Sequence, residues 1–309
     1  MPRPSQVHTN KALENISIAY MPQGLVAQEV SSTVPVVHES DTYYVYSKDN
    51  LRVPNTIWAD GDVPNRSAWN VSTSTYTLTR HALRDLVTDR MVANSDRAIR
   101  PSVDMTEGLT GQIKLRMELD LFTLINTEAN WANETSLSST QVWSANTTIS
   151  NPITFVDSAT TSIRRRSGMK ANTIVMGDPT WKAVKEHTSI VDRIKYTSAQ
   201  SVGPDLVAQL FNLDKVLVSG AVQNSADEGL TDSLADFATD SALVIYQERN
   251  PGLRKPSAFY TFMKEGSTRP YQVRTYRDDE REGDWIEVSN FYQHRIISSD
   301  CAYNIVNTL

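Results

Sequence analysis

The chain has 309 residues, of which 39% are hydrophobic, so it can form one large globular domain or two moderate ones with a real core. Its net charge of -6 argues against a general nucleic-acid binder, because such a protein usually displays a basic face. The only cysteine, Cys301, cannot form an intrachain disulfide, which fits a reducing compartment. No stretch resembles a signal peptide or reaches the length of a membrane span, so we expect synthesis and assembly in the cytoplasm.

Residues 1–40 combine several prolines with short apolar pieces, which is too little hydrophobic sequence for an independent core. The pattern favours an extended N-terminal arm that lies on another surface, although an ordinary packed N-terminal extension is an equal alternative. If the arm contacts another copy of the chain, the apolar residues expected to make the contact are Ile16, Ile18, Leu25 and Val26.

Residues 41–80 are predicted to form the two arms of one extended hairpin. The segments TYYVYS and VSTSTYTLT are rich in the aromatic and β-branched residues that strands favour. A loop as long as the one between them is uncommon inside a compact domain and is usually functional. It carries residue types that are enriched at binding hot spots, which predicts a docking surface formed by Arg52, Trp58, Arg66 and Trp69. The alternative is that the tryptophans fold back onto their own domain.

Two helices are predicted after the hairpin. Residues 81–97 place apolar side chains at helical spacing, which predicts a short surface helix. In residues 101–131, apolar side chains recur at every fourth position from Met105 to Leu121, which predicts one long amphipathic helix. A helix of this length suggests the spine of the molecule.

The start of this long helix carries a capping signal and two glycines. Asp104 can accept from free N–H groups of the first turn, and Glu107 three residues later completes a capping-box pattern. Gly108 and Gly111 each cost about 1 kcal/mol relative to Ala inside a helix, so we expect a bend or a close backbone contact there.

The remainder divides into an α/β region and a β-rich region. Residues 152–254 alternate helical and strand patterns with short connections, which predicts a mixed α/β domain. Arg164, Arg165 and Arg166 lie at the end of its first helix, where basic residues are ordinary capping chemistry; a phosphate contact is the alternative. Residues 256–309 contain four β-rich segments, which we expect to form a sheet along the long helix.

The order of these segments resembles the major capsid proteins of tailed bacteriophages, with the fold named after phage HK97. The resemblance covers nearly the whole chain, and none of its landmarks is a catalytic motif. The segments that carry it are LENISIAYMPQGLVAQEV, YTLTRHALRDLVTDR, ANTIVMGDPTWKAVKEHTSIVDRIKYT, VGPDLVAQLFNLDKVLVSGAV and DSALVIYQERNPGLRKPSAFYTF.

The resemblance implies an α+β fold with an N-terminal arm, an extended β-hairpin loop, a long spine helix with a peripheral β-sheet, and an inserted α/β axial domain. The expected boundaries are an arm at 1–40, a hairpin loop at 41–80, a peripheral domain with the spine at 81–140, an axial domain at 141–254 and peripheral return strands at 255–309.

The resemblance also implies self-assembly as pentamers and hexamers into an icosahedral shell around double-stranded DNA, contacted without sequence specificity. Further partners would be a portal, a decoration protein and a scaffolding protein, the last expected as a separate or removed chain because the arm begins near Met1. An encapsulin-type nanocompartment that encloses a cargo enzyme is the alternative. The hairpin's only lysine, Lys48, lies on its first arm, so we predict no covalent cross-linking.

The sequence offers little support for enzyme chemistry. The five histidines and Cys301 show no metal-ligand spacing, and no nucleophile-elbow, P-loop or dinucleotide-binding motif occurs. The acidic run RDDEREGD from Arg277 lies between two strand signals, so it predicts a solvated hairpin turn rather than a cation site. We therefore expect no catalytic, cofactor or metal site, and no sequence motif supports the alternative of a monomeric hydrolase.

Overall fold

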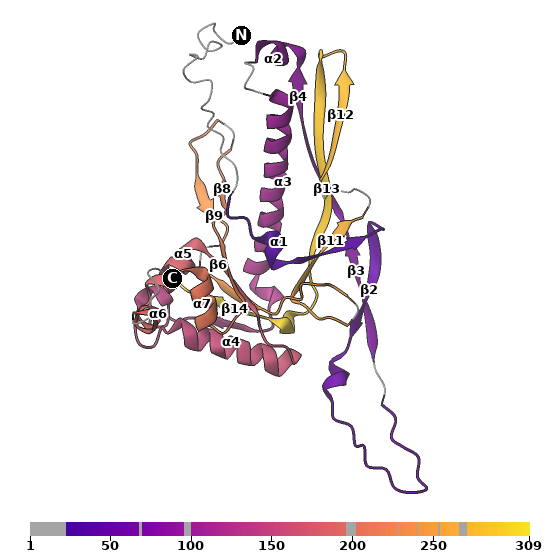
Figure 1. Cartoon of the computed structure of the whole chain (residues 1–309), viewed down its shortest axis with the longest axis vertical. Helices are drawn as coiled ribbons and strands as arrows, with labels where there is room; N and C mark the ends of the chain where they lie inside the picture. The colour runs from indigo at the N-terminus through magenta and orange to yellow at the C-terminus, as the bar shows by residue number, and fades with distance from the viewer. Residues whose placement is uncertain are drawn as a thin grey trace.

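The protein is an elongated molecule in which one long helix connects two sheets, and a narrow hairpin projects from one end (Figure 1). The computed structural model describes residues 23–67, 70–95, 100–195, 202–227, 229–238, 240–252, 254–265 and 271–309.

The long helix α3 spans Pro101–Asn126, which confirms the predicted spine. Its inward face carries the apolar residues at the predicted spacing, including Leu109, Ile113, Met117 and Leu121. The predicted cap at Asp104 is wrong, because the helix already begins at Pro101, whose ring fixes φ at a helical value. No close contact surrounds Gly108, since an added Cβ would meet no atom within 4 Å.

The first sheet lies along α3 and has the order β1-β11-β13-β12, with β4 also paired to β13. Its strands are β1 (Ser32–Val36), β4 (Thr79–Thr88), β11 (Phe259–Lys264), β12 (Gln272–Asp278) and β13 (Gly283–Ile296). Valine and isoleucine side chains of β4 and β13 pack against the first half of α3. This sheet therefore extends along the spine for most of its length, as Figure 1 shows.

Strand β4 corrects the prediction of a surface helix at residues 81–97. It pairs antiparallel with β13 over ten residues, from Thr79 opposite Tyr292 to Thr88 opposite Gly283. Only a short helix, α2 (Asp89–Asn94), follows it, and the hydroxyl of Thr88 accepts from the Met91 N–H at its start. The pairing with the distant strand β13 outweighs the local helical spacing.

The second sheet has the order β5-β14-β10-β6-β7 and is covered by helices. Its strands are β5 (Glu134–Ser136), β6 (Thr173–Gly177), β7 (Lys215–Ser219), β10 (Ala242–Ile245) and β14 (Ala302–Val306). The helices are α4 (Pro152–Ser167), α5 (Asp178–Glu186), α6 (Thr188–Ile194) and α7 (Pro204–Leu210). These elements confirm the predicted α/β region.

Two strands join this sheet from outside the predicted axial segment. β14 was expected in the sheet along α3, but it pairs with β10 and β5 instead. Ala302 and Ile305 of β14 are almost fully buried on opposite faces of the sheet, Ala302 in the core shared with α3 and Ile305 in the core that includes α4. The prediction that all four C-terminal segments lie along the spine is therefore wrong for this last strand.

The remaining elements are small. Two separate hairpins consist of β2 (Ser40–Tyr46) with β3 (Val71–Thr77), and of β8 (Val222–Asn224) with β9 (Leu234–Asp236). Short helical pieces are α1 (Ala27–Val30), η3 (Lys48–Leu51), η4 (Glu128–Asn130), η5 (Trp143–Ala145) and η6 (Ser299–Cys301).

His294 on β13 is a buried histidine that we expect to make stability depend on pH. Its Nε2 lies 3.1 Å from the carbonyl of Met117 and its Nδ1 lies 2.8 Å from the hydroxyl of Thr261. Burial lowers the pKa of His294 to about 4, whereas an unfolded histidine titrates near 6.5. The unfolded state therefore binds the extra proton first as the pH falls from about 6.5 to 4, and the folded state loses stability over that range.

The expected loss is about 3 kcal/mol at pH 4 relative to pH 7, from 1.36 kcal/mol per unit of pKa difference. Denaturant unfolding at both pH values measures it. His294→Gln keeps a donor and an acceptor without the titration, so its pH dependence should be shallower by that amount. If the unfolding free energies of both proteins changed equally with pH, His294 would not be the group responsible. The comparison with the variant is needed because burial also lowers the pKa values of His81 and His187.

Candidate assembly interface

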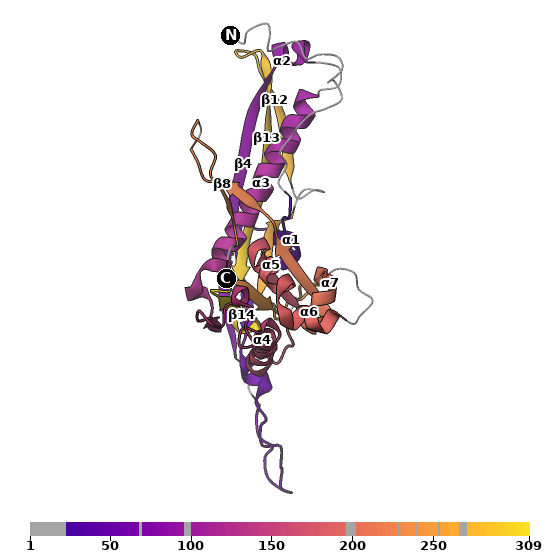
Figure 2. The same ribbon diagram turned by 90° about the vertical axis from the view of Figure 1, so that its left-hand side faces the viewer.

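The ribbon formed by β2 and β3 is anchored at its base and unsupported beyond it. Its strands pair from Ser40 opposite Thr77 to Tyr46 opposite Val71. At the base, the ring of Tyr76 stacks on Phe262 of β11 at 4.6 Å, and Tyr43 lies 5.5 Å from the same ring. Past the strands, the loop extends away from both sheets (Figure 1; Figure 2).

The loop is held in shape by contacts within itself. The indole N–H of Trp58 donates to the carbonyl of Asp62 at 2.5 Å, and the amide of Asn65 donates to the carbonyl of Asn55 at 3.0 Å. Closer to the ribbon, the side chain of Leu51 lies next to Gly168 at the end of α4. Hydrogen bonds within the loop thus shape its tip, while Leu51 at its start also contacts the end of α4.

Apolar side chains on this loop are left in solvent. Val53 is 95% exposed, Ile57 84%, Val63 83% and Trp58 60%. Burying such side chains stabilises by about 1.5 to 3 kcal/mol each, and their exposure together on one projecting segment makes the loop a candidate interaction surface. The prediction named the tryptophans and arginines of this loop and missed these aliphatic residues, although Val53, Ile57 and Val63 stand out among its polar and proline residues.

The predicted interface residues are placed as follows. Arg52, Trp58 and Arg66 lie exposed on the loop, so the alternative in which the tryptophans fold back does not hold for Trp58. Trp69, Ile16 and Ile18 lie outside the described residues. Their part in an interface, like that of the two arginines, stays a prediction.

Leu25 and Val26 are placed differently from the prediction. Val26 is only 7% exposed and packs in the core between α3 and the second sheet, and Leu25 packs partly against it. Downstream of them, β1 pairs in parallel with β11. From about residue 25 to residue 36 the chain is therefore a packed extension of its own fold, which supports the second of the two predicted alternatives for these residues.

A buried carboxylate fastens this extension to the spine. Glu118 on α3 is fully buried, and its two oxygens accept from the N–H groups of Val26 at 3.0 Å and Ala27 at 2.7 Å. The hydroxyl of Ser219, at the end of β7, donates to it at 3.2 Å. Burial raises the pKa of Glu118, and these hydrogen bonds to the ionised form oppose the shift. The sequence signal was an acidic residue one turn before Phe122, on the apolar face of α3.

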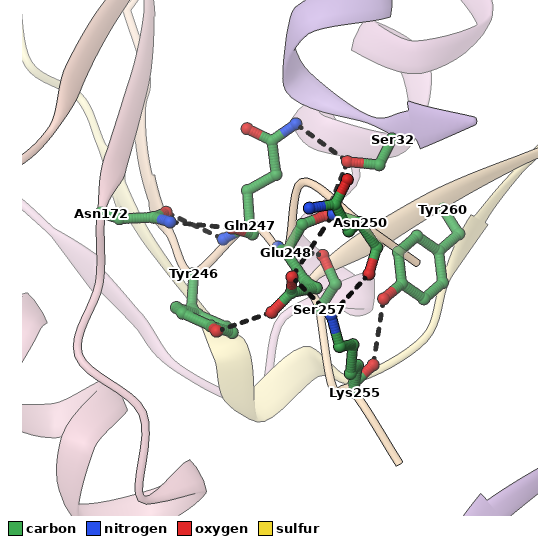
Figure 3. A network of polar contacts seen from close by, with 9 residues as sticks. All are labelled: Ser32, Asn172, Tyr246, Gln247, Glu248, Asn250, Lys255, Ser257 and Tyr260. Carbon is green, nitrogen blue, oxygen red and sulfur yellow. Dashed lines mark hydrogen bonds and ion pairs between the residues drawn. The ribbon is translucent and has the colours of Figure 1, made fainter. Parts of the chain in front are cut away.

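A second polar network joins the extension to the chain segment that runs between the two sheets (Figure 3). The hydroxyl of Ser32 on β1 donates to the carbonyl of Glu248 at 2.6 Å, and the amide of Gln247 donates to the carbonyl of Glu29 at 2.6 Å. The side chain of Asn172, just before β6, exchanges hydrogen bonds with the backbone of Gln247. These bonds hold the two sheets in a fixed relation.

Glu248 is the charged centre of that network. The ammonium of Lys255, 3.2 Å away, holds the pKa of the Glu248 carboxyl below its usual value, and the hydroxyl of Tyr246 also donates to it. Burial raises the pKa of the nearby Tyr260 phenol to about 12. The paired charges and neutral phenols are typical of a structural junction, in which no group is poised to exchange protons near neutral pH.

Other features relevant to chemistry are few in the described part of the chain. No group of three or more His, Cys, Asp or Glu side chains there could hold a metal ion. No helix among these residues is long and apolar enough to cross a membrane. Lys48 forms an ion pair with Asp300 at 2.5 Å, so the lysine of the ribbon is already engaged within its own chain.

Comparisons with known proteins agree with this architecture. No family model matches the sequence. The major capsid protein of Burkholderia phage BcepMu is 24% identical over 303 residues, which cover 95% of this chain and 94% of that protein. The major capsid protein of Pseudomonas phage JBD67 is 27% identical over 252 residues and 80% of each chain.

Solved structures share the fold across nearly the whole chain. A phage-related protein from Bordetella bronchiseptica RB50 has a TM-score of 0.72 with 21% identity, and covers 94% of this chain and 93% of its own. The capsid protein of cyanophage P-SCSP1u has a TM-score of 0.67 with 11% identity, over 97% and 92%. The SrpI encapsulin of Synechococcus elongatus has a TM-score of 0.57 with 10% identity, over 96% and 94%. The chain thus has the HK97 fold and is similar along most of its length to the major capsid proteins of these two phages.

Proposed function

We propose that the chain self-assembles as pentamers and hexamers into an icosahedral shell that encloses the double-stranded DNA of a tailed phage. The shell forms in the bacterial host cytoplasm and becomes the capsid of the virion. The observation that carries this proposal is the ribbon loop, which is ordered by its own contacts and leaves Val53, Ile57 and Val63 in solvent. A segment of that kind buries its apolar groups only against another copy.

This function depends on contacts between subunits, so it requires no reactive residue and no enzyme activity. The loop of one subunit lies across the sheet and spine of its neighbour, with Arg52, Trp58, Arg66 and Trp69 in the contact. Ile16 and Ile18, from the predicted N-terminal arm, contact a further neighbour. The first sheet and α3 form the peripheral domain, and the second sheet with its helices forms the axial domain. Large contacts of this kind are the usual source of stability in obligate assemblies.

Sequence similarity favours packaged DNA over the encapsulin alternative. The two phage major capsid proteins are 24% and 27% identical to this chain, whereas the SrpI encapsulin is 10% identical. No sequence-specific contact is required, because DNA in a shell meets the wall through its phosphates. A portal, a decoration protein and a separate scaffolding protein are further partners that this function implies.

Electron microscopy of the protein expressed in its host, followed by analysis of the particle contents, tests the proposal. We expect closed icosahedral particles whose nuclease-protected content is double-stranded DNA in an infected cell. Particles that hold a single cargo enzyme and no nucleic acid would support the encapsulin function instead. A protein that stays monomeric by light scattering at all concentrations would contradict both.

A further inference from the structure

The C-terminal end of α4 carries more positive charge than the helix needs. Arg164, Arg165 and Arg166 are exposed in its last turn, and Lys170 is exposed just beyond it. The N–H of Gly168, with φ of 74°, already caps the helix by donating to the Arg164 carbonyl at 3.0 Å. A helix end carries about half a negative charge, so four cations exceed the compensation it requires. Within the described part of the chain, none of the four forms an ion pair.

The hairpin of β8 and β9 carries the opposite charge. From Val222 to Asp236 the sequence holds four acidic residues and no basic one. Asp227 and Asp232 are exposed, and neither has a cationic partner among the described residues. Asp232 accepts a hydrogen bond only from the neutral amide of Asn224, at 2.7 Å. The hairpin also exposes apolar side chains, with Leu230 68% and Leu234 71% accessible. It is thus an uncovered surface that combines acidic and apolar groups.

These two surfaces lie on opposite sides of the axial domain. Helix α4 packs against β14 and β10, while the β8–β9 hairpin follows β7 at the other end of the sheet order. Both views place the hairpin above the sheet and α4 below it (Figure 1; Figure 2). One copy therefore cannot bring its own two surfaces together. Copies arranged head to tail in a closed ring can bring them together at every contact, because such a ring joins two different patches of the same chain.

We propose that the cationic end of α4 in one subunit binds the acidic β8–β9 hairpin of the next subunit around the ring of a capsomer. The inference rests on the proposed function, and it adds which surfaces meet at the contact between axial domains. Charge complementarity favours a second copy over DNA as the occupant, since a DNA contact would leave the acidic hairpin and its leucines uncovered. Pairs of this kind guide subunits into one orientation, and salt weakens them.

Charge reversal on each surface, alone and together, tests this contact. One variant carries Arg164→Glu, Arg165→Glu and Arg166→Glu, a second carries Asp227→Lys, Asp232→Lys and Asp236→Lys, and a third carries all six. We expect each single-surface variant to lower the assembled fraction at least tenfold in sedimentation and electron microscopy. The variant with all six substitutions should recover an assembled fraction within about twofold of the wild type, because opposite charges again face each other at every contact.

Three controls make the outcome interpretable. A triple Arg→Lys variant at 164–166 keeps the charge and should assemble as the wild type does. Circular dichroism of the unassembled subunits should still show the native fold. Thermal melting should fall only modestly in the Arg→Glu variant, because acidic side chains at a helix C-terminus oppose the helix dipole. Raising the salt from 50 to 500 mM should weaken wild-type capsomers more than those of a triple Arg→Gln variant.

Particles that assemble normally despite both reversals would overturn the proposal while leaving the shell function intact. Normal shells with reduced DNA content in the arginine variant would assign the cationic end to DNA and also overturn it. If the variant with all six substitutions does not recover assembly although its subunits are folded, the direct contact between the two surfaces is excluded. If the wild type itself forms no particles, the proposed function fails and this inference fails with it.

Discussion

Deletion of residues 50–70 should abolish or greatly reduce shell formation while leaving the subunit soluble and folded. Residues 51–67 are exposed throughout, and the hydrogen bonds of the tip join residues of the loop to one another. Because Tyr46 pairs with Val71, the shortened chain can close the ribbon with a three-residue turn. We therefore expect the free energy of unfolding to change by less than about 1 kcal/mol, since loop length contributes weakly to stability.

The loss in assembly should be large because the deletion removes the same contact from every subunit. Val53, Ile57 and Val63 contribute about 1.5 to 3 kcal/mol each if they become fully buried, and 1.4 kcal/mol corresponds to a factor of ten in an equilibrium constant. Particle yield, measured by sedimentation and electron microscopy at equal protein concentration, should fall by more than a hundredfold.

A matched variant separates the apolar contact from loop length. Val53→Ser, Ile57→Ser and Val63→Ser keep the loop and its internal hydrogen bonds while removing the exposed apolar surface. This variant should assemble nearly as poorly as the deletion. Normal particles from both proteins would exclude a docking role for the loop, whereas normal particles from the serine variant alone would assign the contact to other residues of the loop.

The sequence predicts the elements that are organised by local pattern. The spine follows from an apolar residue at every fourth position from Met105 to Leu121, and β6 with α5 follows from a buried strand ending at Gly177 before the Asp178-Pro179 start of a helix. The ribbon follows from its β-branched composition. In each of these elements the residues close in sequence determine the structure.

The failures share one physical cause, which is pairing between distant segments. Leu83, Leu86 and Val87 fit a helix by spacing, but residues 79–88 gain a full ladder of hydrogen bonds from β13. β14 leaves the sheet of the preceding strands because β10 offers it an edge in the second sheet. Neither partner can be identified from local sequence, since helical spacing and strand composition say nothing of which chain segment lies alongside.

For the same reason, the sequence could not decide between a free arm and a packed N-terminal extension. Its apolar residues looked too few for a core because the rest of that core comes from α3 and the second sheet. The decisive group is Glu118, whose partners lie more than 90 residues away. An acidic residue at an inward position of an amphipathic helix is nevertheless a usable signal. It indicates that unpaired backbone or side-chain donors must be buried against that position.

Replacing Glu118 with Ala should destabilise the subunit by about 3 to 5 kcal/mol, the range for removing one partner of a buried charged contact. The substitution leaves the N–H groups of Val26 and Ala27 and the hydroxyl of Ser219 buried without an acceptor. Denaturant unfolding measures the total loss. Hydrogen exchange locates it, because the amides of residues 26–36 should lose protection before those of the second sheet.

Two further variants test the charge itself. Ser219→Ala removes one donor and leaves the carboxylate with two backbone partners, so it should cost only about 1 kcal/mol. Glu118→Gln keeps the volume but offers one acceptor oxygen in place of two, so its cost should lie between those of the other variants. It also removes a titration: burial raises the pKa of Glu118, so this group favours the folded state most at low pH and less as the pH rises through its folded pKa.

The difference in unfolding free energy between wild type and Glu118→Gln should therefore change with pH above about 4.5. The wild type becomes less stable relative to the variant as the carboxyl ionises. Equal pH profiles would contradict a raised pKa, and unchanged protection of residues 26–36 in Glu118→Ala would contradict the fastening role. The consequence for assembly follows from the geometry. If Ile16 and Ile18 contact a neighbouring subunit as proposed, the bonds of Glu118 to Val26 and Ala27 fix the chain downstream of that contact, and loss of Glu118 should weaken shells even where subunits remain folded.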